Sequence, residues 1–150
     1  MILERGDIWS IKKDTDLILV TTNGTVKKNG ELVMGRGFAQ EVKNQIPWVP
    51  KEAGRIIKFS PLEYGCVVLN QFPGFPRIGL FQVKYNWWEK ADLTLIDYSC
   101  KSLIAFLDSH PRFERVDLVY PGIGNGKLSK DQVAPIIDQL PDSVFVWEKN

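Results

Sequence analysis

The residues best suited to chemistry in this chain lie in two glycine-rich segments. They read Val33-Met34-Gly35-Arg36-Gly37 and Gly122-Ile123-Gly124-Asn125-Gly126. Glycine lets consecutive backbone N–H groups point into one concavity, and such a nest beside a helix N-terminus binds phosphate oxygens. Two nests on one edge of a sheet would hold two phosphates, as in a diphosphate.

A purely structural interpretation of both segments stays open, because tight turns need glycine without any ligand. Neither segment carries a sharper phosphate motif. Gln40 stands where a dinucleotide-binding fingerprint has its third glycine, and Gly126-Lys127 is followed by Leu128 rather than by the Ser or Thr of a P-loop. What favours a ligand is their equivalent placement, since each segment precedes a predicted helix at the carboxyl side of a predicted strand.

A lysine beside aromatic side chains is the candidate for covalent chemistry. Lys84 follows a strand-like run and precedes Tyr85, Trp87 and Trp88. Low-dielectric walls favour the neutral amine, which is the form that attacks an electrophilic carbon. A solvated lysine at the end of a strand is the alternative.

Two polar residues in the N-terminal part of the chain fit ligand recognition. The carboxylate of Asp7 can accept both hydrogens of a purine amino group, although an exposed turn residue has the same type. Asn23 ends a predicted strand, where it serves either as a ribose reader or as an Asx-turn residue. Both alternatives remain open for each residue.

The residue inventory excludes several classes of site. One histidine, His110, cannot supply a His-based metal site or a classical triad, and Cys66 and Cys100 match no metal or redox spacing. We therefore predict no metal, no cofactor and two core cysteines. A net charge of +1 argues against a strongly basic surface that coats nucleic acid, though not against a local basic patch. Because we find neither a signal peptide nor a run of about 18 apolar residues, we expect a cytoplasmic protein.

Apolar patterning predicts alternating strands and helices. Short apolar or β-branched runs predict strands at 16–21, 54–59, 65–72, 77–83, 115–121 and 143–147. Spacing of three and four predicts helices at 37–45, at 93–107 after the N-cap Asp92, and from Ser129, where Gln132 completes a capping box. The segment 22–31 predicts a loop or a small hairpin through Asn29-Gly30 between the first strand and the first helix. This alternation predicts an α/β fold, with helices on both faces of a sheet.

Five segments resemble the macrodomain family, in the family's order and over nearly the whole chain. They are RGDIW (5–9), LILVTTNG (17–24), VMGRGFAQEVK (33–43), FQVKYNWW (81–88) and YPGIGNGKLSKDQV (120–133). The branch that they resemble includes the terminal ADP-ribose protein glycohydrolase and the antitoxin macrodomain that strips ADP-ribose from DNA. The resemblance implies a single domain over 1–150 that binds ADP-ribose, with an α/β/α fold of three layers around a mixed sheet.

The resemblance also implies roles for particular residues. Lys84 matches the lysine that this branch uses catalytically, and Asn23 matches the asparagine that contacts the distal ribose. Asp7 and Ile8 match the contacts to adenine, and Trp147, after the last strand, matches an aromatic position near it. The remaining matches are the two phosphate loops, with Met34, Gly35, Arg36 and Gly37 in the first and Gly122, Ile123, Gly124, Asn125 and Gly126 in the second.

One departure concerns the acid that related protein-directed enzymes carry in or just after the second glycine loop. Here no Asp or Glu follows that loop until Asp131, inside a predicted helix, and Glu31 is the candidate substitute. The leading hypothesis is a monomer that releases ADP-ribose from a modified macromolecule, protein or nucleic acid. A non-catalytic ADP-ribose reader and an ADP-ribose 1″-phosphate phosphatase are the alternatives.

Overall fold

A six-stranded sheet forms the middle of the molecule in the computed structural model, which describes residues 1–60 and 62–149. The strand order across the sheet is β1-β6-β5-β2-β4-β3, and every neighbouring pair is parallel except β3 and β4. The sheet is therefore mixed, as predicted. Its strands are β1 (Ile2–Arg5), β2 (Leu17–Thr22), β3 (Cys66–Val68), β4 (Arg77–Gln82), β5 (Val116–Val119) and β6 (Val144–Glu148).

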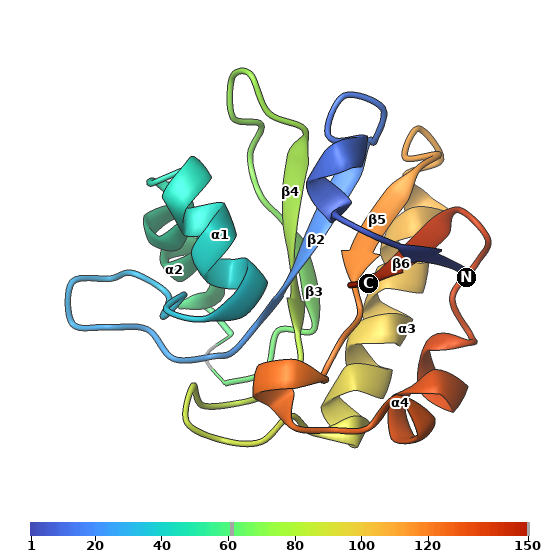
Figure 1. Ribbon diagram of the computed structural model, residues 1–150. Coiled ribbons are helices and arrows are strands. Elements are labelled where there is room, and N and C mark those ends of the chain that lie inside the picture. The colour runs from blue at the N-terminus through green and yellow to red at the C-terminus, as the bar shows by residue number, and fades with distance from the viewer. Residues whose placement is uncertain (61, 150) are drawn as a thin grey trace.

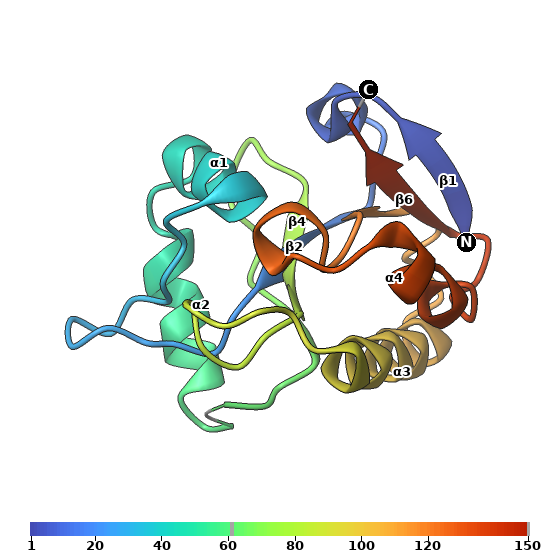
Figure 2. The ribbon, with the colours of Figure 1, turned by 60° about the horizontal axis from the view of Figure 1, so that its bottom comes forward.

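Helices cover both faces of this sheet, so the predicted three-layer α/β/α arrangement is confirmed (Figures 1 and 2). On one face lie α1 and α2, and on the other lie α3 and α4. Two single-turn 3-10 helices, η1 and η2, follow β1 and β5. The helical bounds are η1 (Ile8–Ile11), α1 (Gly37–Gln45), α2 (Val49–Ile57), α3 (Leu93–Ser109), η2 (Gly124–Gly126) and α4 (Lys130–Ile137).

The central strand β2 joins two hydrophobic cores because its side chains alternate between the faces. Leu17 and Leu19 pack in the cluster under α3 and α4, whereas Ile18 and Val20 pack in the cluster under α1 and α2. All four are fully buried. A strand that is covered on both faces reads as a continuous apolar run, which is why 16–21 was recognisable in the sequence.

The helix starts agree with the capping residues in the sequence. The Asp92 carboxylate accepts the Leu95 N–H at 2.9 Å, and α3 begins directly after it. Ser129 and Gln132 form the predicted capping box of α4. Each cap accepts an N–H that the first turn of a helix leaves without an intrahelical partner. The predicted hairpin at 22–31 is also present, with an antiparallel bridge between Val26 and Leu32.

The predicted strand at 54–59 is wrong, because most of it belongs to α2. The buried residues Val49, Ala53 and Ile57 recur every four positions and place one face of a helix on the sheet. The β-branched pair Ile56-Ile57 at the end of this helix was interpreted as part of a strand. Pro50 lies in the first turn of α2, a position at which a helix tolerates proline.

The predicted strand at 65–72 is much shorter in the structure, and β1 was not predicted from patterning. After β3 the chain keeps one ladder bond, from the Leu69 N–H to the Ile78 carbonyl, and then leaves the sheet, with Asn70 donating to Glu52 of α2. Strand β1 is four residues long and lies at the sheet edge, so its Ile2 and Leu3 are half exposed and give no buried pattern.

The residues at 1–60 and 62–149 contain no helix that is both long enough and apolar enough to cross a membrane. In the same residues, no three His, Cys, Asp or Glu side chains gather into a group that could hold a metal ion.

Replacing Gly54 by alanine should destabilise the protein, although alanine favours a helix by about 1 kcal/mol. A Cβ on Gly54 would lie 1.9 Å from the carbonyl oxygen of Gly30, where α2 contacts the hairpin. Because that oxygen is backbone, the two segments must separate, and we expect a net loss of about 2 kcal/mol. Denaturant unfolding measures it, with exposed Lys51→Ala on the same helix as the control. A Gly54→Ala variant as stable as the parent would contradict this contact.

Candidate functional site

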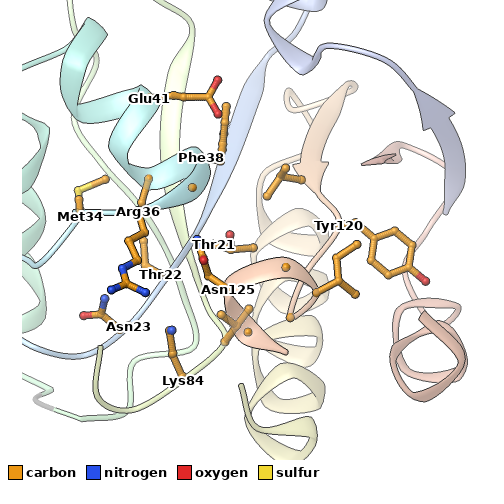
Figure 3. A pocket seen from close by; sticks show the side chains of 18 of the residues that line it. Thr21, Thr22, Asn23, Met34, Arg36, Phe38, Glu41, Lys84, Tyr120 and Asn125 are labelled. Atoms are coloured by element: carbon orange, nitrogen blue, oxygen red, sulfur yellow. The ribbon is translucent and has the colours of Figure 1, made fainter. Parts of the chain in front are cut away.

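The carboxyl ends of β2, β4 and β5 open into one pocket of about 1360 Å³. All the predicted ligand-binding and catalytic residues lie on its wall, and of the predicted site residues Glu31 alone does not. Parallel strands bring the loops at their carboxyl ends to the same edge of a sheet, which is where open α/β folds bind ligands. Figure 3 shows the side chains that β2, α1 and the loop after β4 send into this space.

The first glycine loop leads into a helix that has no side-chain cap. Arg36 occupies the N-cap position of α1 in an extended conformation, and no side chain there accepts an N–H. This differs from α3 and α4, which Asp92 and Ser129 cap. Gly37 and Phe38, in the first turn of α1, line the pocket. The uncapped turn therefore presents N–H groups and the positive end of the helix dipole to the pocket.

The second glycine loop meets the first one across the pocket. It runs from the end of β5 through η2, and Gly122 and Gly124 both have positive φ, at 81° and 66°. A Cβ on Gly37 would lie 3.0 Å from the side-chain nitrogen of Asn125, so the two loops are in contact. The N–H groups of both segments are thereby brought to one region of the pocket wall.

The glycines differ in whether the fold itself requires them. A Cβ on Gly122 would lie 2.8 Å from Ile96 Cδ1, and one on Gly126 would lie 2.9 Å from Ala91 Cβ, so close packing explains both. Gly35 has no atom within 4 Å of its missing Cβ and no positive φ. Neither packing nor backbone conformation accounts for a glycine there. The purely structural interpretation is therefore weakest at Gly35.

Lys84 lies at the same end of the pocket as Arg36 and Asn23 (Figure 3). Burial, followed by the positive charges of Arg36 and Lys127, lowers the pKa of the Lys84 amine from its ordinary value, while Glu89 opposes the shift. The half-buried amine is therefore neutral more often than that of a surface lysine. Of the aromatic neighbours expected to bury it, Trp88 is itself 64% exposed.

Asn23 uses its side chain to hold the first glycine loop. Its Nδ2 donates to the Val33 carbonyl at 3.0 Å, and its Oδ1 accepts the Thr25 N–H at 2.9 Å. The Asx-turn interpretation of Asn23 is thus confirmed. One Nδ2 hydrogen and one Oδ1 lone pair are not used by these two bonds. The ribose contact stays a prediction that these remaining positions permit.

At the opposite end of the pocket, Asp7 is exposed and begins η1 by accepting the Trp9 N–H at 3.0 Å through Oδ1. Trp147 lies inside β6 and not after it, so its predicted place in the chain is wrong. The residue is 7% exposed, and its Nε1 donates to the buried Asp117 at 2.8 Å. Trp147 therefore lines the pocket as part of the core rather than as a free aromatic side chain.

The structure is similar to several solved macrodomains along its whole length. The macrodomain of Thermus aquaticus DarG superposes with a TM-score of 0.75 at 21% identity, covering 99% of this chain and 97% of that one. That of Mycobacterium tuberculosis DarG gives 0.72 at 24% identity, with 99% of both chains covered. The fold is that of a macrodomain.

A third solved structure is Thermosipho africanus DarTG in complex with ADP-ribose. It superposes at a TM-score of 0.74 and 20% identity, and this macrodomain fold spans 42% of that chain. No family model matches the sequence. A Caenorhabditis elegans protein described as signal transducer and activator of transcription b is 27% identical over 118 residues, which are 76% of this chain and 19% of that protein. A likeness over a fifth of that protein carries no functional argument here.

The acid missing from the second glycine loop is not replaced by the predicted candidate. Glu31 accepts from Asn29 and pairs with Lys27 on the hairpin, and it does not line the pocket. Glu89 does line it, with Oε1 fixed by the Asn86 backbone and side-chain nitrogens at 2.8 and 2.7 Å. Glu89 was not predicted from the sequence, because no motif marks a carboxylate five residues after the lysine.

Other pocket residues were also missed. They lie on helices and strands that the sequence predicted, but the sequence did not show that these side chains point into the pocket. Glu41 accepts from Trp9 Nε1 of η1 at 3.3 Å, and Glu148 pairs with Lys130 and Arg5. The helical spacing of Phe38 and Val42 predicted one buried face of α1. It did not show that Phe38, at the start of that face, lines the pocket whereas Val42 does not.

Removing the positive charge of Arg36 should raise the pKa of Lys84. A like charge nearby disfavours the ammonium form, so Arg36→Gln should move the titration midpoint of Lys84 up toward the ordinary lysine value. A titration followed by the ¹³C signal of Lys84 Cε measures the midpoint. Arg112→Gln, outside the pocket wall, is the control and should leave it unchanged. Equal midpoints in the parent and Arg36→Gln would contradict the coupling.

Proposed function

We propose that this chain binds ADP-ribose and releases it from an ADP-ribosylated macromolecule, a protein or a nucleic acid. The observation that carries the proposal is the meeting of two glycine loops and Lys84, whose pKa is lowered by burial and by nearby positive charges, on the wall of one pocket. The complex of Thermosipho africanus DarTG with ADP-ribose, in which 42% of the chain has the same fold, supports the choice of ligand.

The order of the groups along the sheet edge matches the order of groups in ADP-ribose. Following the strands from β1 through β6, β5 and β2 to β4, the carboxyl ends carry, in turn, Asp7, Trp147, the loop 122–126, Asn23 and Lys84. Adenine lies against the first two, the diphosphate lies on the glycine loops, and the distal ribose reaches Asn23 and Lys84. Four strand spacings of about 4.8 Å give an elongated site for an elongated ligand.

Lys84 acts on the distal ribose in one of two ways. As a nucleophile, its neutral amine attacks the anomeric carbon, the bond from that carbon to the acceptor breaks with its electron pair on the acceptor, and the acceptor takes up a proton. Water then hydrolyses the lysine adduct, which frees ADP-ribose and restores the amine. As an ammonium, Lys84 instead stabilises the negative charge that develops on the departing acceptor.

A non-catalytic ADP-ribose reader is the second candidate function. The absence of an acid between Gly122 and Ser129 favours it, because a covalent lysine adduct then lacks the group expected to help resolve it. Release of ADP-ribose from a mono-ADP-ribosylated protein or DNA oligonucleotide, well above the rate in buffer, would exclude the reader. Phosphate release from ADP-ribose 1″-phosphate would point instead to a phosphatase.

Gly35→Glu should strongly weaken ADP-ribose binding without unfolding the protein. The missing Cβ has open space around it, so the fold accepts a side chain, while the new carboxylate occupies the anion site. Like charges in contact cost several kcal/mol, and a loss of about 3 kcal/mol weakens binding on the order of 100-fold. Calorimetric titration measures it. Gly35→Gln, of equal size, separates charge from bulk, and a Gly35→Glu protein that binds like the parent would refute the loop assignment.

Lys84→Ala should lower the release of ADP-ribose by at least about 100-fold while ADP-ribose binding persists. Lys84→Arg retains the charge but not the nucleophile, so its activity distinguishes the two roles of the lysine. Lys90→Ala, on the same loop but outside the pocket wall, is the matched control. Turnover is followed by the free ADP-ribose produced, and unchanged turnover in Lys84→Ala would remove the lysine from the mechanism.

A further inference from the structure

A group of buried polar side chains lies directly behind Asn23 and Lys84. Thr22, Tyr64 and Gln82 are 3%, 7% and 0% exposed, in a region where the sheet is otherwise apolar. Burying a hydroxyl or an amide is costly unless each polar atom finds a partner. These side chains join the ends of three strands, and none of the catalytic or binding roles assigned above includes Tyr64 or Gln82.

The Tyr64 hydroxyl holds the main chain at Asn23. It donates to the Asn23 carbonyl oxygen at 2.6 Å and lies 2.5 Å from Thr22 Oγ1. A phenol has one proton, and a carbonyl can only accept it, so Thr22 must be the donor in the second bond. Burial raises the pKa of the Tyr64 phenol, which therefore remains a donor at working pH. Tyr64 precedes β3 and so reaches past the end of β4 to the end of β2.

The Gln82 side chain holds the main chain at Lys84. Its Oε1 accepts the N–H groups of Tyr64 and Gly65, at 2.8 and 3.2 Å, and its Nε2 donates to the carbonyls of Leu62 and Lys84. All four hydrogen-bonding positions of the amide are thereby used. A further bond, from the Gly24 N–H to the Tyr85 carbonyl at 2.8 Å, ties the two chain segments to each other.

We propose that Tyr64 is a positioning residue for the reaction, one that fixes Asn23 through its main-chain carbonyl while Gln82 fixes the lysine segment. Both the main chain and the side chain of Asn23 are then held, the former by Tyr64 and the latter by the Val33 carbonyl and the Thr25 N–H. Holding a reactive group in place raises the reaction rate, because small displacements from the productive geometry slow the reaction. The inference rests on the proposed release of ADP-ribose by Asn23 and Lys84.

The test compares Tyr64→Phe with Ser99→Ala. Each removes a single buried hydroxyl that bonds to a main-chain carbonyl at the end of a strand. The Ser99 hydroxyl contacts only the Gln82 main-chain carbonyl from the α3 side, so its loss leaves the bonds of the Gln82 side-chain amide in place and does not reach Asn23. We expect Tyr64→Phe to lower turnover about tenfold or more, with ADP-ribose affinity within about twofold of the parent. Ser99→Ala should leave both quantities within about twofold.

A second readout does not depend on activity. The side-chain ¹⁵N–¹H chemical shifts of Asn23 should change in Tyr64→Phe and remain unchanged in Ser99→Ala, because only the first variant removes a hydrogen bond to Asn23. If the parent releases no ADP-ribose from protein or DNA, the proposed enzymatic function fails and these signals alone decide the positioning role. Equal effects of the two variants on turnover, or an unmoved Asn23 signal in Tyr64→Phe, would overturn the inference.

Thr22 provides a second route should Tyr64→Phe fail to fold. Thr22→Val removes the hydroxyl that donates to Tyr64 at nearly constant volume, and Thr22→Ser retains it. We expect turnover and the Asn23 signals to change in Thr22→Val and to return toward the parent in Thr22→Ser. Identical behaviour of these two variants would exclude the hydroxyl network as the cause.

Discussion

The parallel pairing of β2 with β4 and β5 is the constraint on which the site depends. Thr22 pairs with Gln82, and Leu19 pairs with Leu118, so the three strands run in one direction and end at one edge. The residues that follow them must therefore meet there, although Asn23, Lys84 and the loop 122–126 are far apart in the sequence. Burial of β2 on both faces makes this register costly to change, because a one-residue slip would exchange the two cores.

That edge gathers positive charge that the protein does not neutralise by itself. Burial and then the charges of Arg36 and Lys127 lower the pKa of Lys84, against the opposing charge of Glu89. None of these three cations forms an ion pair with a carboxylate in residues 1–60 and 62–149. The uncapped N-terminus of α1 adds the partial charge of its N–H groups. A diphosphate would offset this repulsion, so ligand charge and pocket charge are complementary.

The elements that the sequence predicted well are those whose pattern depends on neighbours along the chain. Apolar spacing of three and four residues identified α3, capping residues placed the starts of α3 and α4, and a continuous apolar run identified β2. The segment 54–59 failed because a β-branched pair at a helix end has the composition of a strand. The pocket wall followed from glycine spacing and family resemblance, whereas Glu89 and Tyr64 did not, because their importance comes from which side chains they face across the fold.

Calorimetric titration of the parent protein with ADP-ribose, with AMP and ATP as controls, tests the central claim most directly. The account predicts saturable binding near the micromolar level, about −8 kcal/mol, that is selective for ADP-ribose. Selectivity is expected because AMP reaches the base end and one phosphate position but leaves the end formed by Asn23 and Lys84 empty. An absence of binding at millimolar ADP-ribose, or equal binding of AMP and ATP, would contradict the assignment of this pocket.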